Sequence, residues 1–106
     1  MPAAVPGGDR STTPVSIRLY PPATSPFTGR TTILVEMLQP QDIRLNMFDI
    51  HGRHVRCLAE GRMETGRHKI GWDGADYSGR QVSPGVYFCR LETGGADLVR
   101  KVVLVR

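Results

Sequence analysis

Repeated alternation of apolar and polar side chains over short segments most constrains how this 106-residue chain can fold. The segments are separated by turns rich in Gly and Pro, at intervals of about 8–12 residues. Alternation with period two places successive side chains on opposite faces of a strand, with one face buried. No segment of about ten residues has the apolar period of an amphipathic helix. The pattern therefore predicts an all-β domain, either a sandwich or a barrel.

Several segments are expected to form strands, and the clearest alternation places Ile43, Leu45 and Met47 on one face. The expected strands cover residues 15–20, 31–38, 42–50, 54–58, 66–72, 85–92 and 96–105. Residues 59–65 are expected to form a loop. The Pro-rich loop at 21–30 contains Phe27, which is expected to pack against one end of the core.

Residues 1–14 consist mostly of Pro, Gly, Ser, Thr and Ala, and they are expected to form a disordered leader or linker. Residues 15–106 are long enough for one domain with one core. The chain shows neither the apolar region of a signal peptide nor the run of about 20 apolar residues that a membrane span requires. If the domain is exported, its signal is expected on a longer parent chain.

The net charge of +4 comes mostly from arginines that are spread along the chain. Such spacing is typical of solvated strand faces. Arg53, Arg56 and Arg90, combined with Tyr87 and Phe88, imitate a surface that stacks on nucleic-acid bases. Because we expect Phe88 in the core, we predict no nucleic-acid partner.

The chain has two cysteines, Cys57 and Cys89, and both fall inside expected strands. Two cysteines are too few for a disulfide-dense scaffold. Each is therefore expected to act as a small buried apolar residue. The sequence leaves open whether the two are joined by a disulfide, because it does not show whether they meet.

Residues with catalytic or metal-binding chemistry occur without the spacing that such chemistry needs. His51, His54 and His68 have no Cys or carboxylate at zinc spacing. Asp73 and Asp76 offer too few oxygens for calcium and lack a closing bidentate Glu. The sequence contains no nucleophile elbow, and a domain this small rarely forms the cleft of a glycosidase. We therefore predict no metal, no cofactor and no enzymatic activity.

An ordered set of motifs runs through residues 20–106. The set comprises Asp49 before the Gly52-Arg53 turn, Gly66, the segment Trp72-Asp73-Gly74, Gly85 followed by Tyr87, and the basic end from Lys101 to Arg106. It resembles the immunoglobulin-like domain of FlgD-type flagellar hook-cap proteins. It also resembles the related C-terminal sorting domain of type IX secretion cargo. This resemblance, with the strand pattern, predicts an immunoglobulin-like β-sandwich of about seven antiparallel strands.

A second, upstream motif fits the same resemblance. Pro26-Phe27-Thr28 leads into Thr31-x-Ile33, as the family's Asn-Pro-Phe loop leads into its Thr-x-Ile strand. The chain departs from the family in having Ser25 where Asn is usual and Cys89 where an aromatic residue is more frequent.

Most of the motif is also what a sandwich needs structurally. Trp72 and Phe88 are expected to be the large apolar anchors of the core. Asp49 and Asp73 are expected to accept backbone N–H bonds where strands end. Gly52 is expected to serve a tight turn.

The resemblance implies a non-catalytic C-terminal sorting or anchoring module of a secreted or cell-surface bacterial protein. Its partners would be secretion or cell-envelope machinery, or neighbouring domains of a larger chain. The sheet surface and the last strand, with Lys101 and Arg106, would be recognised. Two alternatives stay open: a hook-cap-type assembly domain that packs against copies of itself, and an accessory domain that spaces or binds carbohydrate beside an extracellular enzyme. The edge of the last strand could also pair by strand addition.

Overall fold

The computed structural model describes residues 17–22 and 26–105. The regular secondary structure within these residues consists of β-strands alone. The strands are β2 (Ile17–Leu19), β3 (Thr31–Met37), β4 (Gln41–Asp49), β5 (His54–Met63), β6 (Gly66–Trp72), β7 (Gly85–Thr93) and β8 (Asp97–Leu104). All paired strands are antiparallel. The predicted all-β class is therefore confirmed. The predicted leader at 1–14 lies outside the described residues.

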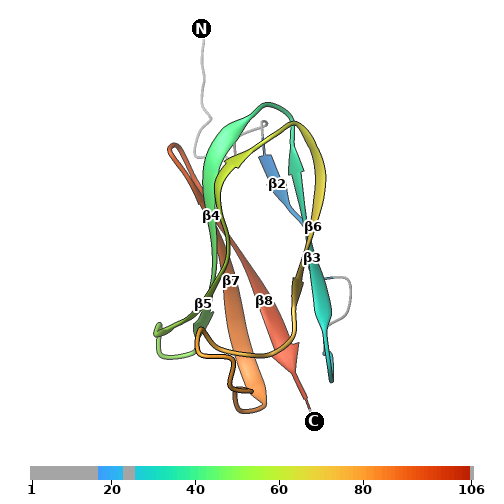
Figure 1. Cartoon of the computed structure of the whole chain (residues 1–106), viewed down its shortest axis with the longest axis vertical. Helices are drawn as coiled ribbons and strands as arrows, with labels where there is room; N and C mark the ends of the chain where they lie inside the picture. Colours follow the sequence, from blue (N-terminus) through green and yellow to red (C-terminus); the bar gives the residue numbers. More distant parts are fainter. Residues whose placement is uncertain (1–16, 23–25, 106) are drawn as a thin grey trace, which may run out of the picture.

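The strands form two sheets that face each other, as Figure 1 shows. One sheet has the order β2-β3-β6 and the other the order β5-β4-β7-β8. The chain crosses between the sheets after β3, after β5 and after β6. This arrangement of two packed antiparallel sheets is the immunoglobulin-like sandwich that the sequence predicted.

The core lies between the sheets and is built from alternate residues of the strands. In β4, the predicted inward face of Ile43, Leu45 and Met47 is confirmed, and all three side chains are buried. The other buried apolar strand residues include Ile17, Leu19, Ile33, Val35, Met37, Cys89, Leu91, Val102 and Leu104. Period-two burial in both sheets explains why each strand has one apolar face and one polar face.

Three aromatic side chains close one end of the core. Trp72 is 1% exposed, and its ring centroid lies 5.6 Å from that of Phe27 and 5.4 Å from that of Tyr87. The backbone N–H of Phe27 donates to the Val103 carbonyl at 2.9 Å, and the Val105 N–H donates to the Phe27 carbonyl at 2.8 Å. The expected packing of Phe27 against one end of the core is therefore confirmed.

The prediction of a loop at 59–65 is wrong, because β5 continues to Met63. Gly61 pairs with Ile43, and Met63 pairs with Gln41. Two register shifts in the β4–β5 pair break the alternation of β5, and its last residues are mostly exposed. An edge strand whose register is shifted in this way shows no regular period-two pattern in its sequence.

The expected burial of Phe88 is also wrong, because Tyr87 takes the core position. Tyr87 is 7% exposed, whereas Phe88 is only partly buried on the outer face of the four-stranded sheet. Adjacent strand residues point to opposite faces, so only one of this aromatic pair can reach the core. The alternation with buried Cys89 and Leu91 selects Tyr87.

Truncating Trp72 should destabilise the whole domain. We expect Trp72→Ala to lower the free energy of unfolding by about 3–5 kcal/mol, because it removes a fully buried aromatic contact between the sheets. The matched change Phe88→Ala, on the outer face, should cost no more than about 1 kcal/mol. Denaturant unfolding followed by tryptophan-independent circular dichroism measures both, and equal losses would contradict the assignment of the two faces.

Candidate functional site

Asp49 ends β4 and organises the turn that follows it. Its Oδ1 accepts the N–H groups of His51 at 2.8 Å and Arg53 at 2.9 Å, and its Oδ2 accepts Nε–H of Arg53 at 2.8 Å. Gly52 has a φ of 80°, which a side chain would disfavour. The backbone N–H of Arg53, with its guanidinium, holds the pKa of Asp49 below its usual range. The predicted role of Asp49 as an acceptor at a strand end is confirmed by this geometry.

The segment Trp72-Asp73-Gly74 forms the second turn of this end. The indole Nε1–H of Trp72 donates to the Ala75 carbonyl at 2.9 Å. Asp73 Oδ1 accepts the Ala75 N–H at 3.1 Å and the Nη1–H of Arg56 at 3.2 Å. Gly74 has a φ of 79°. The segment is thus a strand end followed by an Asx-type turn, as predicted.

Asp76 closes the next loop on itself. Its Oδ1 accepts the backbone N–H of Ser78 at 2.9 Å, the Ser78 hydroxyl at 2.7 Å and the Arg80 N–H at 3.1 Å. The hydroxyl of Ser78, followed by these backbone donors, lowers the pKa of Asp76. Within residues 17–22 and 26–105 there is no group of three side chains suited to hold a metal ion. The Asp73–Asp76 loop is therefore built on internal hydrogen bonds.

The Tyr87 hydroxyl fixes the start of β7. It donates to the Ser83 carbonyl at 2.5 Å, four residues upstream. A buried Tyr near the start of a strand, bonded back to the preceding corner, is a tyrosine-corner arrangement typical of immunoglobulin-like sandwiches. Tyr87 thus contributes its ring to the core and its hydroxyl to the loop.

The Asp49 turn and residues 76–87, which run from the Asp76 loop into the start of β7, border an open groove of about 610 Å³. Catalysis in such a groove would need a proton acceptor or a nucleophile. Asp49 and Asp76 both line it, but each carboxylate accepts three hydrogen bonds and has a lowered pKa, which makes it a weak base. The two carboxylates of the groove are therefore engaged in hydrogen-bonded turns, and His51, His54 and Tyr77 line the groove beside them.

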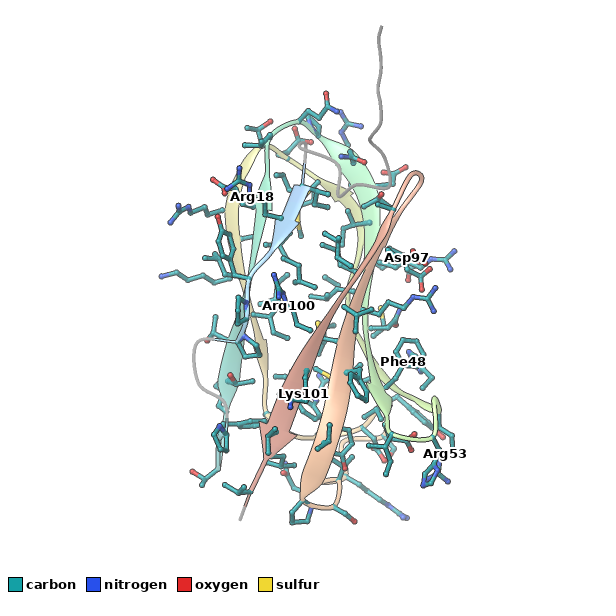
Figure 2. All side chains as sticks on the ribbon, turned by 180° about the vertical axis from the view of Figure 1, so that it is seen from behind. Arg18, Phe48, Arg53, Asp97, Arg100 and Lys101 are labelled. Carbon is teal, nitrogen blue, oxygen red and sulfur yellow. The ribbon has the colours of Figure 1, made fainter. Side chains whose placement is uncertain are left out.

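The structure does not bring the predicted motif residues into one site. Gly66 begins β6 opposite Met37, whereas Trp72 ends β6 opposite Thr31. Gly85 begins β7. Lys101 lies exposed on β8, away from the Asp49 turn with Arg53 (Figure 2). Arg106 lies outside the described residues.

A patch on the outer face of the four-stranded sheet was missed by the sequence reasoning. Phe48 of β4 lies directly opposite Phe88 of β7, which in turn lies opposite Lys101 of β8. The ring of His54 meets that of Phe48 edge-on, at a centroid distance of 5.6 Å. Phe48 follows the inward-facing Met47 in β4 and so lies on the outer face, but only the register between strands brings these four side chains together.

The two cysteines have different environments, and both thiols are free. Cys89 is buried in the core as expected, and burial raises the pKa of its thiol to about 12. The expected burial of Cys57 is wrong. Cys57 is exposed opposite Asn46, because the register shifts in β5 turn it to the outer face.

No helix long and apolar enough to cross a membrane occurs in the described part of the chain.

The two antiparallel sheets, the buried Trp72 and the Tyr87 corner define an immunoglobulin-like sandwich module. The chain belongs to the FlgD Ig-like domain family, whose model matches residues 22–97. The FlgD-type resemblance drawn from the sequence is thereby confirmed.

Known proteins similar to this chain include two basal-body rod modification proteins. The basal-body rod modification protein FlgD of Salmonella typhimurium strain LT2 is 36% identical over 75 residues, which cover 68% of this chain and 32% of that protein. The FlgD protein of Salmonella typhi matches with the same values. The chain therefore spans about a third of the length of these curated relatives.

Among solved structures, dimeric latent PorU from Porphyromonas gingivalis shares the fold. The TM-score is 0.65 at 18% identity, and the match covers 96% of this chain and 10% of that one. At this identity the likeness shows the sandwich fold alone.

The lowered pKa of Asp49 makes the stability of the turn depend on pH. A depressed carboxyl pKa stabilises the fold above its usual value of 3.8, and this contribution is lost as the pH falls through the lower folded-state pKa. We expect Asp49→Asn to melt below the wild type at about pH 6 and to converge with it at about pH 2. Thermal unfolding at both pH values checks this, and a gap that persists in acid would contradict it.

Thiol reactivity should separate the two cysteines. In the native protein at about pH 8, a thiol reagent should label Cys57 and leave Cys89 unreacted, because Cys89 is buried with a raised pKa. Cys57→Ser should abolish native labelling, and Cys89→Ser should retain it. Equal labelling of both single variants would show that the core opens to the reagent.

Proposed function

We propose that this domain is a non-catalytic assembly module of a longer chain, in the manner of a FlgD-type flagellar protein. The observation that carries the proposal is that the side chains of the motif residues are engaged in the turns and the core of the domain. Asp49, Asp73 and Asp76 accept hydrogen bonds within their own turns, and Trp72 and Tyr87 fill the core. These residues maintain a rigid sandwich and leave its outer surfaces for contacts with other proteins.

Family membership and sequence identity favour the flagellar alternative over the other two. The match to FlgD of Salmonella typhimurium extends over most of this chain at 36% identity. Because the chain spans about a third of that protein, the domain would work beside other parts of its parent chain. Its contacts would then be made with those parts, or with neighbouring subunits of an assembly.

Sorting through cell-envelope machinery is a second candidate, supported by Lys101. This lysine is exposed in the middle of β8 and has no carboxylate partner within residues 17–22 and 26–105. A cation without a partner on a sheet face is available for recognition by another protein. Sorting of the parent protein to the outside or the cell surface would depend on this face.

A domain exchange tests the assembly function. The 75-residue region of Salmonella typhimurium FlgD that aligns with this chain would be replaced by the whole chain, in a strain lacking its own FlgD. We expect the chimera to restore part of the swimming that the unrepaired strain has lost. The same chimera with Trp72→Ala should fail, because the module no longer folds stably.

The matched test of sorting fuses the chain to an exported reporter in a host with type IX machinery. Surface display that is lost with Lys101→Ala and kept with Lys69→Ala would favour sorting. A chimera that does not restore swimming although the domain is folded would rule out the assembly function.

A further inference from the structure

Among residues 17–22 and 26–105, no strand pairs with the outer edge of β8 between Asp97 and Lys101. Thr93 N–H donates to the Ala96 carbonyl, so Thr93 and Ala96 form a hydrogen-bonded pair of the β7–β8 ladder. This pair determines which residues of β8 bond to β7 and which do not. Because hydrogen-bonded pairs alternate along an antiparallel ladder, Leu98 and Arg100 direct their backbone groups toward β7. The backbone N–H and C=O groups of Asp97, Val99 and Lys101 therefore point away from β7, outward from the edge of the sheet.

The contacts of Phe27 show independently that the odd-numbered residues of β8 direct their backbone groups outward. Its backbone bonds to the Val103 carbonyl and the Val105 N–H, so these odd-numbered residues also point outward. The Phe27 segment covers the edge there, at the end of β8. Toward Asp97 the strand leans away from β2, as Figure 2 shows, and the side chain of Arg100 reaches across the gap, donating to the Leu19 carbonyl at 2.8 Å.

The other sheet edges are protected. β5 has two register shifts, and its Val55 carbonyl accepts the Tyr77 N–H at 2.9 Å. Bulges and covering loops are common ways to block strand addition. β6 carries exposed Arg67 and Lys69, so two copies of it would repel each other. β2 has only three residues.

The open part of β8 is complementary to itself. Its sequence is Asp97-Leu98-Val99-Arg100-Lys101, with opposite charges two residues either side of Val99. If two such strands run antiparallel about Val99, Asp97 of each lies opposite Lys101 of the other. Opposite charges placed directly across from each other stabilise a strand pair. Val99, which is 52% exposed, would face its own counterpart.

The side chains of this segment are placed for such a contact. Asp97, Val99 and Lys101 share the outer face with the residues opposite them in β7, namely Glu92, Arg90 and Phe88. Arg90 Nη2 donates to Asp97 Oδ2 at 2.6 Å and holds that carboxylate on the face. Lys101 has no acidic partner on its own chain within the described residues, as noted above.

We propose that β8 pairs antiparallel with β8 of a second copy of this chain, about a two-fold axis beside Val99. The pairing joins the two four-stranded sheets into one continuous sheet. Asp97 and Lys101 form ion pairs across the axis, and the outward backbone groups of both strands form the new ladder. The inference deepens the proposed assembly function by naming the surface through which copies meet.

Charge exchange on β8 tests the pairing in the whole chain. Sedimentation of the wild type up to about 1 mM should show a monomer–dimer equilibrium. In the proposed dimer, position 97 of one copy faces position 101 of the other. A dimer of Lys101→Asp would therefore place two carboxylates opposite each other, and a dimer of Asp97→Lys would place two ammonium groups opposite each other. Each variant alone should self-associate at least about tenfold more weakly, and an equimolar mixture should recover the dimer.

Lys69→Asp is the matched control, because it makes the same change on the edge strand β6. It should leave self-association unchanged, and circular dichroism should show that all the variants are folded. A wild type that stays monomeric throughout the range, or a mixture that recovers no dimer, overturns the proposal. If the wild type stays monomeric but the domain exchange restores swimming in Salmonella, the β8 pairing is wrong and the assembly function still stands.

A cross-link at residue 99 tests the position of the axis. Val99→Cys, in a Cys57→Ser background, should oxidise readily to a disulfide-linked dimer. Hydrogen-bonded antiparallel pairs have Cα atoms about 5.5 Å apart, which suits a disulfide. Lys69→Cys in the same background should cross-link far more slowly. Association without preferential cross-linking at residue 99 would place the interface elsewhere and overturn the proposal.

Discussion

The packing of Trp72 against Phe27 and Tyr87 is the contact on which the rest of the domain depends. Trp72 ends a strand of one sheet, Tyr87 lies in the other sheet, and Phe27 comes from the segment that bridges to β8. The indole N–H is bonded to the Ala75 carbonyl, so a large aromatic group is buried without an unsatisfied donor. This contact sets how the sheets meet at one end and fixes the loop that leaves β6.

The loops at that end show how a small sandwich uses charged residues. Asp49 and Asp76 each accept several donors from the residues that follow them, and their pKa values are lowered as a result. Ionised carboxylates of this kind stabilise turns but are poor proton acceptors. The residues by which the family is recognised are therefore mainly those that hold its scaffold together, and function has to be sought on the surface.

The edges of the sheets distinguish the surfaces of this domain from one another. The β5 edge is interrupted by register shifts and touched by the loop that contains Tyr77, whereas β8 is regular and, within the described residues, is covered near Phe27. An open regular edge is a natural site for strand pairing unless its charges oppose it. In β8 the charges are arranged so that a second copy complements them, and this edge is continuous with the outer face that carries Phe48 and Phe88.

Much of the fold was accessible from the sequence because it depends on local chemistry. Alternation identified the inward face of β4, and the Asp-containing turns were identified from residues whose side chains bond to the adjacent backbone. The length of β5, the inward choice of Tyr87 over Phe88 and the exposure of Cys57 were not accessible. Each depends on how one strand is aligned with its neighbour, and register is set by pairing between distant segments.

The same distinction applies to the candidate surfaces. The sequence by itself determined the class of fold, the turn chemistry and the self-complementary charges of residues 97–101. Only the tertiary structure decided that Phe48, Phe88 and Lys101 share one face, and that Asp97, Val99 and Lys101 direct their backbone away from the sheet. The physical reason is that the direction of a backbone hydrogen bond depends on the partner strand, which a single segment of sequence does not specify.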